Sequence, residues 1–307
     1  MSTEGSTKAI LAALAANAGI AVAKFVGFVI TGSSSMLAEA VHSVADTSNQ
    51  GLLLFGQRQA RKEATSLHQF GYGRSRYFYS FVVALVLFSL GAIFALYEGY
   101  HKISHPRALT SPIVAVVILV VAIGLETFSF RTAMVESRPL KGRSTWWQFI
   151  RRSRNPELPV VLLEDTGALL GLIFALGGVG LTVLTGDPVW DGVGTMLIGA
   201  LLGVIAVILM VEMHSLLIGE GATAEDCRAI QAALEGTDRI DRVIHLRTQY
   251  LGPDEMLVAA KIALAPGTDL ATVAATIDAA EAATRAAVPA AKVIGGTGRV
   301  ADLQAGD

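Results

Sequence analysis

The sequence predicts a mainly α-helical membrane protein, with six transmembrane helices followed by a small C-terminal α+β (ferredoxin-like) domain. Of its 307 residues, 52% are hydrophobic and 16% are charged, and the mean hydropathy is +0.54. Soluble domains carry about 25% charged residues, so this deficit indicates lipid as the main solvent. Long apolar stretches fill the first two thirds of the chain, and helical and strand-like patterns alternate after Glu220.

Six apolar segments are long enough to cross a bilayer, since a helix needs about 20 mostly apolar residues for this. They are residues 10–31, 35–57, 79–100, 113–134, 159–184 and 188–211. The second segment is the least apolar, because it holds Glu39, His42 and Asp46. Its position between a Gly-Ser turn and an apolar run favours a helix that is buried among the others.

The basic residues divide unevenly between the two sides of the predicted membrane. The connections after the second and fourth segments are rich in Lys and Arg, and the opposite connections are poor in them. The positive-inside rule therefore places both termini in the cytoplasm. No Arg-rich, acid-poor transit segment precedes residue 10, which favours a multi-pass protein of the cell's inner (plasma) membrane over one of an organelle.

The predicted boundary divides the chain into a membrane domain, residues 1–219, and a cytoplasmic domain, residues 220–307. In the second domain we expect an α-β-β-α-β order. Its elements are predicted at 224–236, 240–251, 255–265, 268–287 and 290–295.

Several function classes are disfavoured by composition and motif. A net charge of −2 gives no case for nucleic-acid binding. The single cysteine, Cys227, excludes a CxxC-type zinc site. No HExxH motif or nucleophile–base constellation occurs, so we expect neither an enzyme nor a prosthetic group.

The second segment carries the spacing of a metal site. His42 and Asp46 lie four residues apart on one helix face, with Glu39 a turn earlier and Asn49 a turn later. Ionisable groups within a span cost a few kcal/mol each and seldom occur without a partner or a role. An imidazole and a carboxylate at this spacing can share one divalent ion. The alternative is a hydrogen bond between His42 and Asp46 that serves only helix packing.

The fifth segment adds two adjacent carboxylates, Glu164 and Asp165. Neighbouring helical residues point about 100° apart, so we expect one of the two to face the second helix. The other would line water, pair with a basic group or act as an additional ligand. Gly167, Ala168 and Gly171 follow, and such small residues let another helix approach closely.

Several motifs give the chain a resemblance to the cation diffusion facilitator family. They are AEAVHSVAD at 38–46, HQFGYGR at 68–74 and DPVWD at 187–191. The basic loop with Trp146, Trp147 and Gln148, which leads to LLED at 162–165, is similar to the zinc-transporter-nine branch of that family.

The resemblance implies a homodimeric transporter that exchanges zinc or a related divalent ion for protons, with two ligands from span two and two from span five. His42, Asp46 and Asp165 match the ligand positions. Many members have His or Asp four residues before the last of these, where this chain has Val161. Glu164 could replace that ligand, Glu39 or Asn49 could complete the shell, or the fourth ligand could be water.

From residues and resemblance together, we expect a divalent transition-metal cation transporter of the bilayer, with zinc as cargo and metal/proton antiport by alternating access. The alternative is a non-transporting regulator or scaffold that kept the fold.

Overall fold

The computed structural model describes residues 18–142 and 144–294, which form two compact units. The first unit contains the described parts of residues 1–57 and 78–214, and the second contains those of 58–77 and 215–307. The division near residue 214 lies close to the predicted boundary at 219. The loop at 58–77, which the predicted boundary assigns to the membrane domain, groups with the second unit instead.

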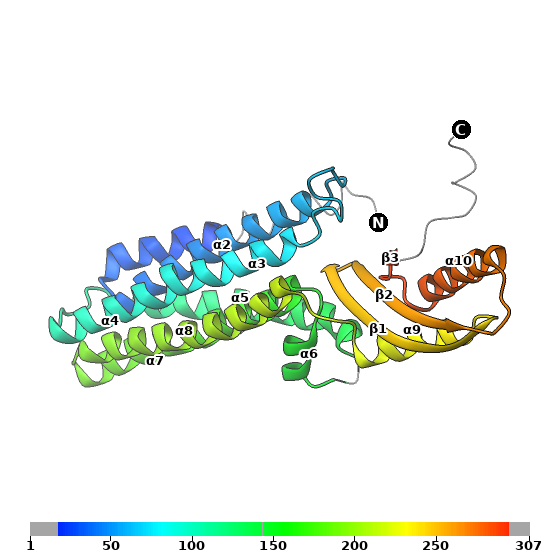
Figure 1. The fold of residues 1–307 in the computed structure, drawn as a ribbon. Coiled ribbons are helices and arrows are strands. Elements are labelled where there is room, and N and C mark those ends of the chain that lie inside the picture. The colour runs from blue at the N-terminus through cyan, green and yellow to red at the C-terminus, as the bar shows by residue number, and fades with distance from the viewer. Residues whose placement is uncertain (1–17, 143, 295–307) are drawn as a thin grey trace. The chain divides into compact units, whose positions relative to one another are not determined.

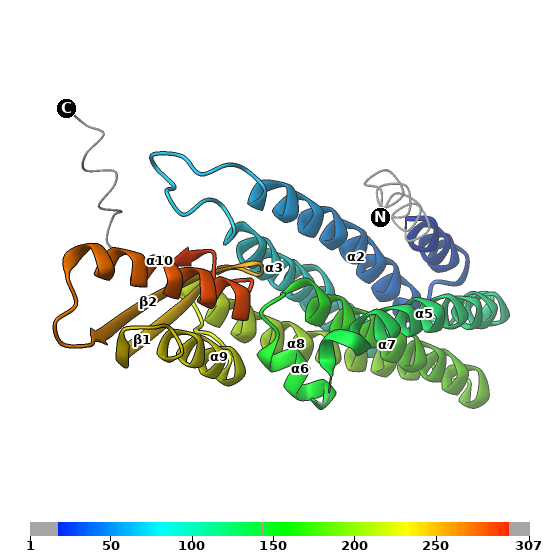
Figure 2. The same ribbon diagram turned by 90° about the vertical axis from the view of Figure 1, so that its right-hand side faces the viewer.

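The first unit is a bundle of long helices that run side by side (Figures 1 and 2). Its helices are Ala18–Thr31, α2 (Ser34–Ala60), a continuous run of α3 (Ser75–Val86), the π-helix η1 (Leu87–Ile93) and α4 (Phe94–Ser104), then α5 (Pro112–Lys141), α7 (Glu157–Thr185) and α8 (Val189–Ile218). The predicted mainly helical class is confirmed.

Four of these helices are long and apolar enough to cross a membrane: Ser75–Ser104, Pro112–Pro139, Glu157–Thr185 and Val189–Ile218. The described part of the first predicted span is a shorter apolar helix, Ala18–Thr31, and residues 10–17 lie outside the described chain. Helix α2 has 27 residues, nearly as many as these four helices, but polar side chains are spread along it. The number of crossings therefore stays a prediction.

A short helix, α6 (Trp146–Arg152), lies in the segment that we expected to be a basic loop. Thr145 caps it, since its side chain accepts a hydrogen bond from the Gln148 backbone while the Gln148 side chain accepts one from the Thr145 backbone. This capping box is a local signal for the start of a helix. The many basic residues of the segment led to its prediction as a loop.

Asp191, at the start of α8, caps the N-terminus of α2. Its buried carboxylate accepts hydrogen bonds from the Ser33 hydroxyl (2.7 Å), the Ser34 backbone N–H (2.8 Å) and the Ser35 backbone N–H (3.3 Å). The Lys102 ammonium of α4 lies 3.8 Å from the same carboxylate. Helices α4 and α8 thus hold the end of α2 in place, which fixes the register of the helix that carries His42.

The second unit has the predicted α-β-β-α-β order. It consists of α9 (Ala224–Glu235), β1 (Ile240–Gly252), β2 (Glu255–Leu264), α10 (Leu270–Ala287) and β3 (Val293–Ile294). β1 and β2 are antiparallel with Tyr250 opposite Met256, and β3 is parallel to β2. Side chains of α9 and α10 form one core with these strands, including Ile230, Met256 and Ala280.

The loop at 58–77 contacts the β1–β2 hairpin of this unit. Gly73 lies so close to β1 that a Cβ atom there would sit 2.8 Å from the Leu251 carbonyl oxygen. Arg76 pairs with Asp254 at 2.8 Å. These contacts explain why this loop belongs to the second unit.

Candidate metal centre

The polar face of α2 is buried inside the bundle. Glu39, His42 and Asn49 are fully buried, and the Asp46 side chain is 14% exposed. The His42 Nδ1 atom and the Asp46 Oδ1 atom lie 3.5 Å apart. The i, i+4 spacing therefore brings imidazole and carboxylate side by side, as the sequence predicts.

Three polar atoms of these two side chains lack hydrogen-bond partners within the described chain. Both ring nitrogens of His42 and the Oδ1 atom of Asp46 are buried and form no hydrogen bond there. Buried polar atoms are nearly always paired, so an orphaned set of this kind calls for a ligand such as an ion or water. His42 and Asp46 lie 3.5 Å apart without a hydrogen bond between them, and the choice between a metal site and a packing contact stays a prediction.

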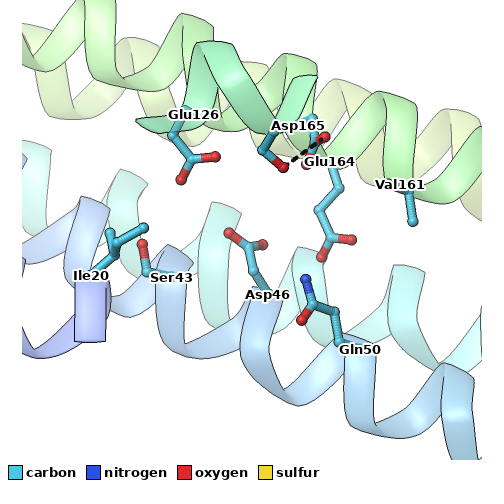
Figure 3. Close-up of a pocket in the computed structure, with 9 residues that line it drawn as sticks. Ile20, Ser43, Asp46, Gln50, Glu126, Val161, Glu164 and Asp165 are labelled. Atoms are coloured by element: carbon cyan, nitrogen blue, oxygen red, sulfur yellow. Dashed lines mark hydrogen bonds between the residues drawn. The ribbon is translucent and has the colours of Figure 1, made fainter. Parts of the chain in front are cut away.

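Glu164 of α7 points toward α2, whereas Asp165 turns toward α5 (Figure 3). The Asn49 amide donates a hydrogen bond of 2.5 Å to Glu164 Oε1, and the Glu164 side chain is buried. Asp165 accepts a 3.4 Å hydrogen bond from the Ser129 hydroxyl. Of the two adjacent carboxylates, Glu164 is thus the one that faces the second helix.

A cavity of about 30 Å³ lies between these helices, and four carboxylates line it (Figure 3). Its lining residues are Ile20, Ser43, Asp46, Gln50, Glu126, Ser129, Val161, Glu164 and Asp165. A water molecule requires a cavity of at least about 10–15 Å³ by such a measure, so there is room here for an ion or a water molecule or two. The high density of carboxylates suits a cation.

Within residues 18–142 and 144–294, no three His, Cys, Asp or Glu side chains converge closely enough to hold a metal ion. Asp46 and Glu164 both line the cavity, whereas His42 lies beside Asp46 and is not among the lining residues. A complete ligand shell would need α2 and α7 to approach, or the Asn49, Gln50 or water oxygens to contribute.

Glu39, a further predicted ligand, is paired with a lysine. The Lys24 ammonium lies 3.0 Å from Glu39 Oε2 and donates a 2.9 Å hydrogen bond to the Ser43 hydroxyl. The other oxygen of Glu39, Oε1, is buried without a hydrogen-bond partner among the described residues. It lies against α7, where a Cβ atom on Gly171 would be only 2.6 Å away.

Four polar lining residues, Ser43, Gln50, Glu126 and Ser129, did not feature among the predicted ligands. Glu126 offered a signal, since it is an ionisable residue in an otherwise apolar helix. Ser43, Gln50 and Ser129 gave none, because polar uncharged side chains are common on membrane helices. Val161 packs beside Ala133, Phe149 and Leu162, which accounts for an apolar residue at this position.

Comparison with known proteins gives a match to the cation efflux transmembrane domain over residues 10–218. This chain belongs to the cation efflux family. It is 31% identical to "Proton-coupled zinc antiporter SLC30A9, mitochondrial" of both Mus musculus and Homo sapiens over 262 residues, which is 84% of this chain and 46% of each relative. It is also 27% identical to "Metal tolerance protein C4" of Arabidopsis thaliana, over 84% of this chain and 57% of that protein.

These relatives confirm the predicted branch of the family, the one similar to zinc transporter nine. The chain spans about half the length of the curated relatives it matches. Members of the cation efflux family are transporters rather than enzymes, in line with the expected class.

The same relatives overturn the expected inner (plasma) membrane location, because the mouse and human proteins are mitochondrial by name. That expectation rested on the composition of the residues before position 10. Such a short stretch is a weak guide beside similarity over 84% of the chain.

Proposed function

We propose that this cation efflux protein carries divalent transition-metal ions, with zinc as the principal cargo, in exchange for protons. The observation that carries the proposal is the buried His42 imidazole, whose two ring nitrogens form no hydrogen bond to the described residues and lie beside an Asp46 oxygen that also forms none. A neutral imidazole with carboxylates is a donor set that suits zinc. The zinc transporters among the relatives add to this support.

In the proposed cycle, His42 and Asp46 of α2 receive the ion and a carboxylate of α7 completes its shell. Protons compete with the metal for the same lone pairs. The ion is therefore released where protons are abundant and taken up where they are scarce. Movement of α2 and α7 relative to each other would open the site to one side at a time.

The proposal includes six crossings, with α2 and helix Ala18–Thr31 among them, and a homodimer with both ends in one compartment. A buried α2 whose polar face meets α7 would be shielded from lipid by its neighbours. The α-β-β-α-β order of the second unit supports a ferredoxin-like fold.

The test is zinc flux into vesicles that contain the purified full-length protein and an internal zinc dye, with and without a pH gradient. We expect flux to depend on the gradient and to fall by at least about tenfold in His42→Ala and Asp46→Ala, since even outer-shell partners of a metal site are worth 10–100-fold. Ser48→Ala, on the exposed face of the same helix, is the matched control. Equal flux in all four proteins would refute the site, and zinc binding without flux would favour a non-transporting regulator.

A further inference from the structure

A buried lysine lies beside the proposed metal site, and the transport chemistry described above gives it no role. Lys24, on helix Ala18–Thr31, has a side chain that is 1% exposed, and its ion-pair partner Glu39 is 0% exposed. The ammonium contacts Glu39 Oε2 at 3.0 Å and the Ser43 hydroxyl at 2.9 Å. Both partners belong to α2, where Ser43 directly follows His42 and also lines the carboxylate cavity.

The position of this lysine matters because charges interact strongly where water is excluded. Unit charges separated by one helical turn still interact appreciably at the effective dielectric of a protein interior. A fixed positive charge beside His42 and Asp46 opposes the entry of a divalent cation. It also occupies one oxygen of Glu39, a carboxylate that could otherwise reach the ion.

We infer that Lys24 is a resident cation of the transport site, which lowers the affinity for the metal and so permits its release. The inference rests on the proposed function. A transporter has to bind its ion firmly enough to load and weakly enough to unload. Five acidic side chains gather around α2, α5 and α7 here, namely Glu39, Asp46, Glu126, Glu164 and Asp165. Without a counter-charge, such a cluster would hold a divalent ion too tightly.

One oxygen of Glu39 is available to a metal ion, which supports the inference. Glu39 Oε1 is buried, faces α7 at Gly171 and has no hydrogen bond within the described chain. Removing the lysine would leave the whole carboxylate without a partner, one turn from His42. Glu39 would then act as an additional ligand. Removing Glu39 instead would leave the ammonium without its carboxylate partner, and its uncompensated charge would repel the ion more strongly.

The test compares Lys24→Met, Glu39→Gln and the double variant, with Lys24→Arg as the charge-conserving variant and the exposed Lys62→Met as the matched control. Calorimetry with Zn²⁺ on the full-length protein in detergent gives Kd, and vesicles give the maximal flux. We expect Kd to fall by about tenfold or more in Lys24→Met, with slower maximal flux, and to rise by about tenfold in Glu39→Gln. The double variant and Lys24→Arg should stay within about threefold of the parent.

A purely structural ion pair makes a different prediction, because both single changes would then weaken zinc binding and the double variant would do so too. That result, or an unchanged Kd in Lys24→Met, overturns the inference. If Lys24→Met does not fold, the double variant decides, since it must bind zinc about tenfold more tightly than Glu39→Gln. If His42→Ala abolishes zinc binding but Lys24→Met leaves Kd unchanged, this inference is refuted and the proposed function stands. A parent that binds no zinc would refute both.

Discussion

At the scale of single residues, Glu164 and Asp165 have different surroundings although they are neighbours in sequence. Glu164 is buried, faces α2 and accepts a hydrogen bond from Asn49, whereas Asp165 bonds to Ser129 of α5. We therefore predict that Glu164→Gln weakens zinc binding more than Asp165→Asn, by at least about tenfold in Kd, because a ligand to the ion matters more than a neighbouring charge. Zinc titration of both isosteric variants checks this. A larger loss in Asp165→Asn would assign the ligand as the family resemblance does.

Gly171 is a second residue whose close contacts lead to a specific prediction about stability. A Cβ atom there would lie 2.6 Å from Glu39 Oε1, whereas one at Gly177, further along the same helix, would meet nothing within 4 Å. Gly171→Ala should lower the unfolding free energy by about 1–3 kcal/mol, as overpacking does in a close-packed interior. Gly177→Ala should be neutral or slightly stabilising. Thermal unfolding of the two variants in one detergent provides the comparison, and equal stability would contradict the close contact of α2 and α7.

At the scale of elements, the cap that Asp191 places on α2 joins three helices. Asp191→Ala removes the acceptor for the Ser33, Ser34 and Ser35 donors and leaves the buried Lys102 without its nearby carboxylate. We expect a loss of about 2–4 kcal/mol in unfolding free energy, since a buried charge loses its partner. Asp191→Asn keeps an acceptor oxygen and should lose less. Thermal denaturation checks the order of the two variants, and identical melting temperatures for both and the parent would rule out a capping role.

Some features of these elements can be predicted from the sequence and others cannot. The α-β-β-α-β order after Glu220 and the common face of His42 and Asp46 follow from local periodicity, which depends only on neighbouring residues. The Lys24–Glu39 pair and the choice of Glu164 over Asp165 as the side chain facing α2 depend on how distant helices rotate and pack. Spacing along one helix does not determine that rotation. The same reason explains why the loop at 58–77 grouped unexpectedly with the second unit.

At the scale of the whole molecule, one unit is a helical bundle that buries the His42 imidazole beside a carboxylate, and the other is a small α+β unit. Among the described residues, Cys227 lies on α9 of the second unit, away in sequence from the donors of α2 and α7. A zinc ion bound by the bundle should therefore have nitrogen and oxygen ligands without sulfur.

X-ray absorption at the zinc edge of the loaded, full-length protein tests this claim most directly. We predict a first shell of nitrogen and oxygen at about 2.0–2.1 Å, with the scattering pattern of a single imidazole that disappears in His42→Ala. Asp46→Asn should retain the imidazole if zinc still binds. A sulfur shell at about 2.3 Å, or an imidazole signal that persists in His42→Ala, would contradict a metal site built on α2.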